Sequence, residues 1–433
     1  MKKVLLITTD FNQGGLGKQS YLWLTRFKIV SKFVVFDVQE FLSEVYKEDS
    51  KVISLNCKIW LGSKAGKMLY ELKRVFCILK SAFYILSILK KEKPNIVISF
   101  SYIPNIYNIF SSYLNRHYAI LVEHSYPKFD LNKSIKARIF LKILSSIYKI
   151  SKNNKHIYFI AISKGIKQFY EYEIGIEAER VVYIPNAYDI HEILHKSQQP
   201  VQYPLRDFLD NIEYVVNVGR LTKAKGQWYL LRIFSNLKRY FPNLKLLILG
   251  DGELKQKLVN LSENLGMRTF VWDRDIFSSN FDVYFLGYQE NPFNIISKGR
   301  LFVLTSLWEG LPNVIIEALA CQIPIISTDC KSGPRDILAP NLDENEKIKQ
   351  PYFADYGILM PEFSNNYKEH LEHLDEVEKM WIETIRWVLM NPHILSKYKN
   401  KSLQRAYDFD IGKVHKMWEN FIENLGDGKI QSR

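Results

Sequence analysis

The hydrophobic positions of this chain form short apolar runs that alternate with stretches of helical periodicity. Such alternation is typical of βαβ units, in which helices join the strands of a parallel sheet. In the first half, the predicted strands are Val4–Thr9, Phe33–Phe36, Ile96–Phe100, Ala119–Glu123, Tyr158–Ile162 and Val181–Ile184, and the predicted helices include Gly15–Ile29 and Leu69–Lys91.

A second series of the same kind begins after residue 210. The segment Ala187–Asp210 has weak periodicity and two prolines, so we interpret it as a linker. We therefore predict an α/β fold of two Rossmann-like parallel-sheet domains, residues 1–195 and 205–405, that face each other across a cleft. A terminal helix at about 410–433 is expected to pack back on the first domain. The predicted strands of the second domain are Tyr214–Val218, Leu244–Leu249, Val283–Leu286, Leu301–Thr305, Ile323–Ser327 and Tyr356–Met360.

Two carboxylates lie near a predicted turn between a strand and a helix in the second domain. Glu309 precedes Pro312, which suits the first position of a helix, and Glu317 lies within that helix. Open α/β sheets bind ligands at this mouth, where carboxylates can accept hydrogen bonds from sugar hydroxyls. A pair for hydrolytic acid/base work is the alternative, since spacing does not define the separation in space.

Two cations follow another strand of the same domain. Gly219 and Arg220 come directly after Tyr214–Val218, and Lys225 precedes the next helix. Together with the helix N-terminus at Pro312, they would surround a diphosphate with positive potential. A pair of solvated surface cations is the simpler alternative.

A glycine loop and a histidine stand out in the first domain. Gly14 and Gly15 open the first helix, where backbone N–H groups can approach an anion. The loop lacks the P-loop spacing but comes close to the dinucleotide fingerprint, which keeps a nicotinamide-dependent oxidoreductase open as an alternative. His124 follows a strand and is expected to point into the cleft from the opposite wall. A lone histidine is more often structural than catalytic.

The net charge of +13 is unevenly distributed. No acidic residue lies between Asp130 and Glu171, an interval rich in Lys and Arg at helical spacing, and a second basic run covers Lys58–Lys93. Amphipathic basic helices bind anionic membrane surfaces, so we expect a membrane partner, and a basic non-catalytic membrane protein is a further alternative. We expect no nucleic-acid partner, because no recognised module accompanies the charge.

The four cysteines show no metal-binding spacing, which indicates a reduced, cytoplasmic protein. The first residues form too short an apolar run for a signal peptide. The longest apolar stretch, Phe76–Leu89, contains a lysine and is too short to span a membrane, so no transmembrane segment is expected.

The motifs of the second domain resemble those of the family-4 retaining glycosyltransferases of GT-B architecture. Between Val218 and Leu338 the chain reads VGRLTKAKG, LGDGEL, FLGY, SLWEGLPNVIIEALACQIPIISTD and GPRDIL, in that family's order. The resemblance implies that Arg220 and Lys225 bind the donor diphosphate, while Glu309 contacts the donor sugar and Glu317 the nucleotide ribose. His124 is implied to assist at the donor sugar. The other residues expected to bind the donor are Gly14, Gly15, Asn186, Gly219, Gly310, Leu311, Pro312 and Asn313.

The same resemblance implies a nucleotide-sugar donor, UDP-linked in many such enzymes, and a lipid-linked or surface-glycan acceptor at the cytoplasmic membrane face. It implies front-face transfer without a metal or other cofactor. The pair Asp273 and Asp275 has the DxD spelling of a metal site, but it lies in Thr269–Phe281, which we interpret as an insertion. A second loop extension is expected at Asn341–Phe353.

Overall fold

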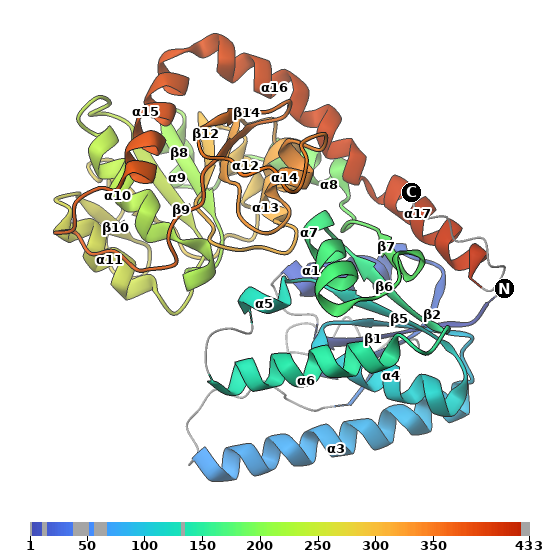
Figure 1. The fold of residues 1–433 in the computed structure, drawn as a ribbon. Coiled ribbons are helices and arrows are strands. Elements are labelled where there is room, and N and C mark those ends of the chain that lie inside the picture. Colours follow the sequence, from blue (N-terminus) through green and yellow to red (C-terminus); the bar gives the residue numbers. More distant parts are fainter. Residues whose placement is uncertain (1, 11–14, 38–51, 56–66, 131–134, 426–433) are drawn as a thin grey trace. The chain divides into compact units, whose positions relative to one another are not determined.

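The computed structural model describes residues 2–10, 15–37, 52–55, 67–130 and 135–425. The chain divides into two compact units, residues 1–187 with 412–433, and residues 188–411. Each unit contains one sheet with helices packed on it (Figure 1). The predicted α/β fold with two parallel sheets is confirmed.

The first unit is built on a seven-stranded sheet in which every neighbouring pair is parallel. Strands buried on both faces are continuous apolar runs, as in IVISF of β4, where all five residues are buried. The strand order is β3-β2-β1-β4-β5-β6-β7. The bounds are β1 (Val4–Asp10), β2 (Val30–Asp37), β3 (Val52–Ser54), β4 (Ile96–Phe100), β5 (Tyr118–Glu123), β6 (Ile157–Ala161) and β7 (Val181–Tyr183).

Helix α4 (Tyr102–Asn115) lies between α3 (Lys67–Glu92) and α6 (Ile135–Ser151) in this unit (Figure 1). The Tyr107 hydroxyl of α4 donates to the Ile78 carbonyl of α3, and Asn105 of α4 donates to the Tyr148 hydroxyl of α6. Helix α17 (Ile411–Asn424) also packs here, with the Trp418 ring edge-on to Trp23 at 4.7 Å between centroids. The other helices are α1 (Gly15–Arg26), α5 (Pro127–Asp130) and α7 (Lys164–Gln168), with a π-helical turn at Phe169–Ile174.

The second unit is built on an eight-stranded sheet, parallel except for the last pair. Its order is β10-β11-β9-β8-β12-β13-β15-β14. The strands are β8 (Tyr214–Val218), β9 (Lys245–Leu249), β10 (Thr269–Val271), β11 (Val283–Phe285), β12 (Leu301–Leu304), β13 (Ile325–Thr328), β14 (Tyr352–Phe353) and β15 (Ile358–Met360). The helices are α8 (Ile190–Ser197), α9 (Leu205–Leu209), α10 (Gln227–Leu237), α11 (Lys255–Asn264), α12 (Phe293–Ile296), α13 (Asn313–Ala320), α14 (Pro334–Leu338), α15 (Glu376–Met390) and α16 (Pro392–Ala406).

Three expectations about the second unit were wrong. The predicted linker Ala187–Asp210 contains α8 and α9, because the Asp189 side chain caps α8 and Ile190 is buried. The predicted insertion Thr269–Phe281 begins with β10, whose three residues are all buried beside β11. Pro312 precedes the first helical residue of α13 and has extended backbone angles.

Candidate active site

The carboxyl edge of the second sheet has the topology of a ligand site. Strand β8 lies between β9, which follows it in sequence, and β12, which comes later on its other side. The loops after β8 and β12 therefore separate at this point, which is the switch point where open α/β sheets bind ligands. The loop after β8 carries Gly219, Arg220 and Lys225, and the loop after β12 carries Glu309 and Gly310.

An ion pair between Lys225 and Glu309 joins these two loops. The Lys225 Nζ lies 2.5 Å from the Glu309 Oε1, and the two side chains are only 15% and 10% exposed. The Ser306 hydroxyl donates to the same carboxylate oxygen at 2.6 Å. Burial raises the pKa of the neighbouring Cys330 thiol, and the Glu309 charge adds to this effect. A partly desolvated cation and carboxylate are thus held together at the switch point.

Two glycines allow the site loops to meet at backbone contact. Gly226 has φ +57°, and a Cβ there would lie 2.4 Å from the Thr305 carbonyl oxygen. Gly250 has φ +133°, and a Cβ there would lie 2.1 Å from the Gly219 carbonyl oxygen. Only glycine combines these backbone angles with such approaches. The glycines of the VGRLTKAKG and LGDGEL stretches therefore determine the shape of this edge.

The loop that leads into α13 is held from several sides. The Glu309 N–H donates to the Lys331 carbonyl at 2.9 Å, and the Ser332 hydroxyl donates to the Gly310 carbonyl at 2.9 Å. Leu311 and Pro312 are buried. The Tyr188 hydroxyl donates to the Asn313 side chain at the start of α13. The first N–H groups of a helix have no intrahelical acceptors, so this rigid start of α13 presents donors suited to an anion.

Arg220 and Glu317 have contrasting environments. The Arg220 side chain is exposed, while its carbonyl accepts a hydrogen bond from Gln227 at 3.1 Å. Glu317 is only 4% exposed, so it is not a solvated helix residue. Burial raises the pKa of Cys321, one turn further along, and the Glu317 charge contributes.

The predicted residues of the first unit lie at the carboxyl edge of its own sheet. His124 follows β5, with its ring edge-on to Phe100 at 4.9 Å between centroids. Burial lowers the pKa of His124 to about 4, and the neighbouring Asn186 side chain offsets part of that shift. The imidazole is therefore neutral at pH 7. Gly15 is the first residue of α1, and Gly14 lies outside the described residues.

Several residues of the site were missed from the sequence. Tyr188, Ser306 and Ser332 each make a hydrogen bond to the loop around Glu309 or to α13. Tyr188 is more than a hundred positions from its partner, so local pattern carries no signal of it. Ser306 could have been suggested by its position directly after the predicted strand Leu301–Thr305, three residues before Glu309.

The DxD-like pair is engaged in local ion pairs. Asp273 lies 2.6 Å from the Lys255 Nζ, and Asp275 lies 3.0 Å from the Arg274 guanidinium. Across the residues that the structure describes, no group of three or more His, Cys, Asp or Glu side chains is arranged to hold a metal ion. In the same part of the chain, no helix has the length and apolar character needed to cross a bilayer.

Comparison with known proteins shows the family of this chain. Residues 207–345 match the family model described as glycosyl transferases group 1. An uncharacterized glycosyltransferase of Methanocaldococcus jannaschii is 34% identical over 399 residues, covering 91% of this chain and 92% of that protein. An N-acetylgalactosaminyltransferase of Campylobacter jejuni, named for a diacetylbacillosaminyl-diphospho-undecaprenol substrate, is 28% identical over 252 residues, covering 58% and 56%.

The solved structures with similar folds include a protein of Anabaena, HepE, in complex with UDP. It has a TM-score of 0.66 and 15% identity, and the alignment covers 98% of this chain and 100% of that one. This likeness shows the fold, which is the GT-B architecture of two parallel-sheet units. The Methanocaldococcus relative is similar over nearly the whole length of both proteins, and the family model matches within the second unit. The chain therefore belongs to the group 1 glycosyltransferases.

Proposed function

We propose that this glycosyltransferase moves a hexose or N-acetylhexosamine, with retention, from a UDP-linked donor to a lipid-linked or surface-glycan acceptor. The name of the Campylobacter relative includes a diphospho-undecaprenol acceptor, and the Anabaena structure contains UDP. The family assignment sets aside a nicotinamide-dependent oxidoreductase and a non-catalytic membrane protein.

The observation that carries the proposal is the Lys225–Glu309 pair at the switch point. Diphosphate oxygens would attract Lys225, while Glu309 accepts hydrogen bonds from hydroxyls of the donor sugar. Glu317 is proposed to hold the ribose. The donor therefore spans the two loops that the ion pair joins.

Departure of the diphosphate requires compensation of its growing negative charge. Arg220 and Lys225 supply positive charge, and the start of α13 supplies N–H donors aimed at an anion. The donor phosphate accepts the proton of the attacking acceptor hydroxyl on the front face, and no metal is needed for either step. Neutral His124 is proposed to donate a hydrogen bond to the donor sugar, with the loop at Gly14 and Gly15 near the diphosphate.

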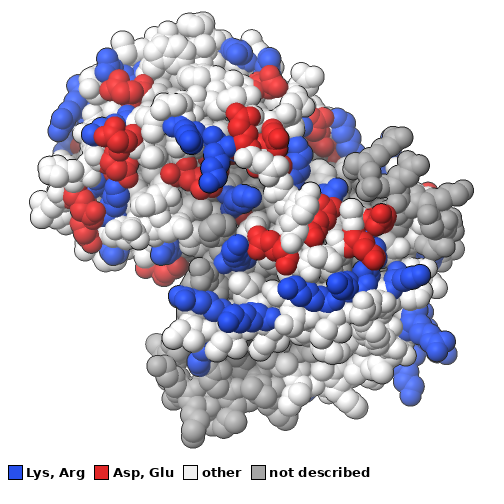
Figure 2. All heavy atoms as spheres, in the orientation of Figure 1, with Lys and Arg blue, Asp and Glu red and all other residues white. Residues whose placement is uncertain are grey.

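The acceptor is proposed to lie at the cytoplasmic membrane surface, and α6 is proposed to bind that surface. Figure 2 shows Lys and Arg side chains gathered across the first unit at the level of α6. One stripe of this helix exposes isoleucines at spacings of four and seven, which place them on one face, where their contact with solvent is unfavourable. Basic residues flank the stripe, as in helices that lie in the headgroup region. The stripe comprises Ile135, Ile139, Ile143 and Ile150, and Arg138, Lys142 and Lys149 are exposed beside it.

Donor binding and turnover can be tested separately. Thermal stabilisation by a panel of sugar nucleotides identifies the donor, since a ligand at 100 times its Kd adds ~2.7 kcal/mol of stability. With that donor, Glu317→Ala is expected mainly to raise KM and Arg220→Ala mainly to lower kcat for UDP release. Lys225→Ala should be severely impaired, whereas Lys223→Ala, which removes an exposed charge from the same turn, should behave as wild type.

Two results would contradict this proposal. Loss of UDP release on adding a chelator would show that a metal carries the phosphate charge. Equal effects of the Lys223 and Lys225 substitutions would show that the ion pair has no special role. For the membrane, Ile139→Ser should weaken binding to phosphatidylglycerol vesicles, and Ile276→Ser, at a 94% exposed position of the second unit, should not.

A further inference from the structure

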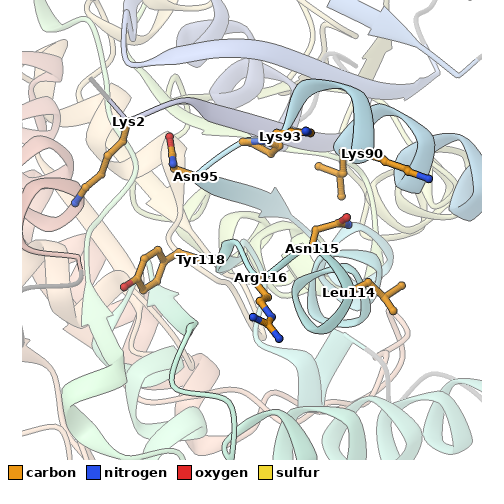
Figure 3. A pocket seen from close by; sticks show the side chains of 10 residues that line it. Lys2, Lys90, Lys93, Asn95, Leu114, Asn115, Arg116 and Tyr118 are labelled. Carbon is orange, nitrogen blue, oxygen red and sulfur yellow. The ribbon is translucent and has the colours of Figure 1, made fainter.

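A basic pocket lies in the first unit, at the amino edge of the sheet. Its volume is about 570 Å³, and it is open to solvent on one side. Figure 3 shows Lys93 and Arg116 on opposite sides of it, with Asn95 and Tyr118 on one flank and Asn115 on the other. The pocket is thus formed where α3 and α4 end and the next strands begin.

Of the four cationic residues that line the pocket, only Lys2 helps to hold the fold together. Lys2 is used structurally, since its Nζ donates to the Ile422 and Leu425 carbonyls at the end of α17. Within the described part of the chain, no hydrogen bond or ion pair engages the side chains of Lys90, Lys93 and Arg116. Three residues that line the cavity therefore carry positive charges that no described side chain compensates.

Backbone conformation sets the position of two of these cations. Lys93 has φ +46° and Arg116 has φ +52°, the left-handed conformation in which helices commonly end. Non-glycine residues rarely adopt this conformation. At each of the two helix ends it turns the chain sharply at the rim of the pocket. Lys93 follows α3 and Arg116 follows α4, so the two helix ends bring both charges to one place.

This pocket is separate from the proposed catalytic residues of the same unit. Strand β5 begins at Tyr118, which lines the pocket, and ends at Glu123, next to His124. A six-residue strand extends roughly 17–20 Å. The pocket and His124 therefore lie at opposite ends of the sheet, and one ligand of ordinary size cannot occupy both.

Exposed apolar side chains continue from the rim of the pocket along α4. Leu114 lines the pocket and is 70% exposed, and Phe110 and Tyr113 are also exposed on the same helix. A basic pocket with an apolar border suits an anionic headgroup whose acyl chains lie beside it. We propose that this pocket binds a phosphate ester, supplied either by the headgroup of an anionic phospholipid or by a soluble phosphate compound.

The test uses the full-length protein and a soluble lipid. Isothermal titration with dihexanoyl phosphatidylglycerol below its micelle concentration is expected to show saturable binding at one site. A K90Q/K93Q/R116Q variant should weaken this binding by on the order of 100-fold, since each cation near an anionic surface contributes about fivefold. Glutamine has the same backbone requirements as the residues it replaces, so unchanged thermal midpoints are expected.

A charge-matched control distinguishes the loss of the pocket's cations from a general decrease in the net charge of the protein. The K397Q/K399Q/K401Q variant removes three exposed positive charges from α16 of the second unit and should bind the lipid as wild type does. Equal losses in both variants, or no saturable binding of either the lipid or glycerol 3-phosphate by the wild type, would overturn the proposal. Titrations with glycerol 3-phosphate and inorganic phosphate identify the source: tight binding of glycerol 3-phosphate supports a soluble ester, tight binding of inorganic phosphate shows that the phosphate group itself is recognised, and binding of the lipid alone supports a headgroup.

Phosphate binding at the pocket and glycosyl transfer are expected to be independent of each other. UDP release by the K90Q/K93Q/R116Q variant, with a donor and a soluble acceptor, should equal that of the wild type while phosphate binding is lost. A wild-type protein that bound the lipid but released no UDP from any donor would contradict the proposed function and leave the phosphate pocket standing.

Discussion

Replacing Gly226 with alanine tests whether backbone contact between two loops positions the Lys225–Glu309 pair. A Cβ at residue 226 would lie 2.4 Å from the Thr305 carbonyl oxygen, which cannot rotate away as a side chain could. The Leu307 N–H also donates to the Ala224 carbonyl at 2.7 Å, so the two loops are tied on both sides of the contact. The substitution must therefore move one loop relative to the other.

The expected loss of stability has two parts. Alanine in the left-handed conformation costs roughly 1–2 kcal/mol, of which about 0.4–1 kcal/mol is offset by the lower entropy of the unfolded chain. Forcing a methyl group into a packed site adds typically 1–3 kcal/mol. We expect Gly226→Ala to lower the free energy of unfolding by about 2–4 kcal/mol. A displacement near 1 Å at Lys225 would also lower kcat by up to ~100-fold.

Gly266→Ala is the matched control. Gly266 has φ +78° in the same unit, and nothing lies within 4 Å of its Cβ position, so only the conformational cost of about 1 kcal/mol applies. Urea unfolding of the full chain, followed by tryptophan fluorescence, measures both variants, and UDP release measures kcat. Stability losses that agree within about 0.5 kcal/mol, or an unchanged kcat for Gly226→Ala, would refute the reasoning.

Other features give further predictions. The Arg232–Glu378 pair, at 2.6 Å and almost fully buried, should make Arg232→Met destabilising by about 3–5 kcal/mol in urea unfolding with little change in kcat; a loss below about 1 kcal/mol would contradict this. Burial lowers the pKa of His117 and His124 from 6.5 to about 4, so the unfolded chain binds more protons between these values. Stability should be fully present above about pH 6.5 and fall as the pH decreases towards 4, and substituting both histidines with asparagine should flatten this curve. The Ser163 hydroxyl caps α7, so Ser163→Ala should cost about 1 kcal/mol in thermal or urea unfolding, and Ser163→Asp should retain most of the stability.

The sequence by itself determined the features that depend on short-range pattern. The continuous apolar run Leu301–Thr305 indicated a strand buried on both faces, and β12 has all four of its residues, Leu301–Leu304, buried. Glycines beside cations after a strand marked Arg220 and Lys225 as candidates, because parallel strands end at one edge. These signals lie within a few residues of one another, where local backbone preferences act.

Tertiary structure alone decided which of those residues meet. Lys225 and Glu309 are 84 positions apart, and they pair because β12 lies beside β8 on the side opposite β9. The same strand order places the three residues of β10 in the sheet beside β11. Such contacts depend on the order and register of strands, which arise when the whole sheet assembles and buries its faces, so no short segment of sequence encodes them.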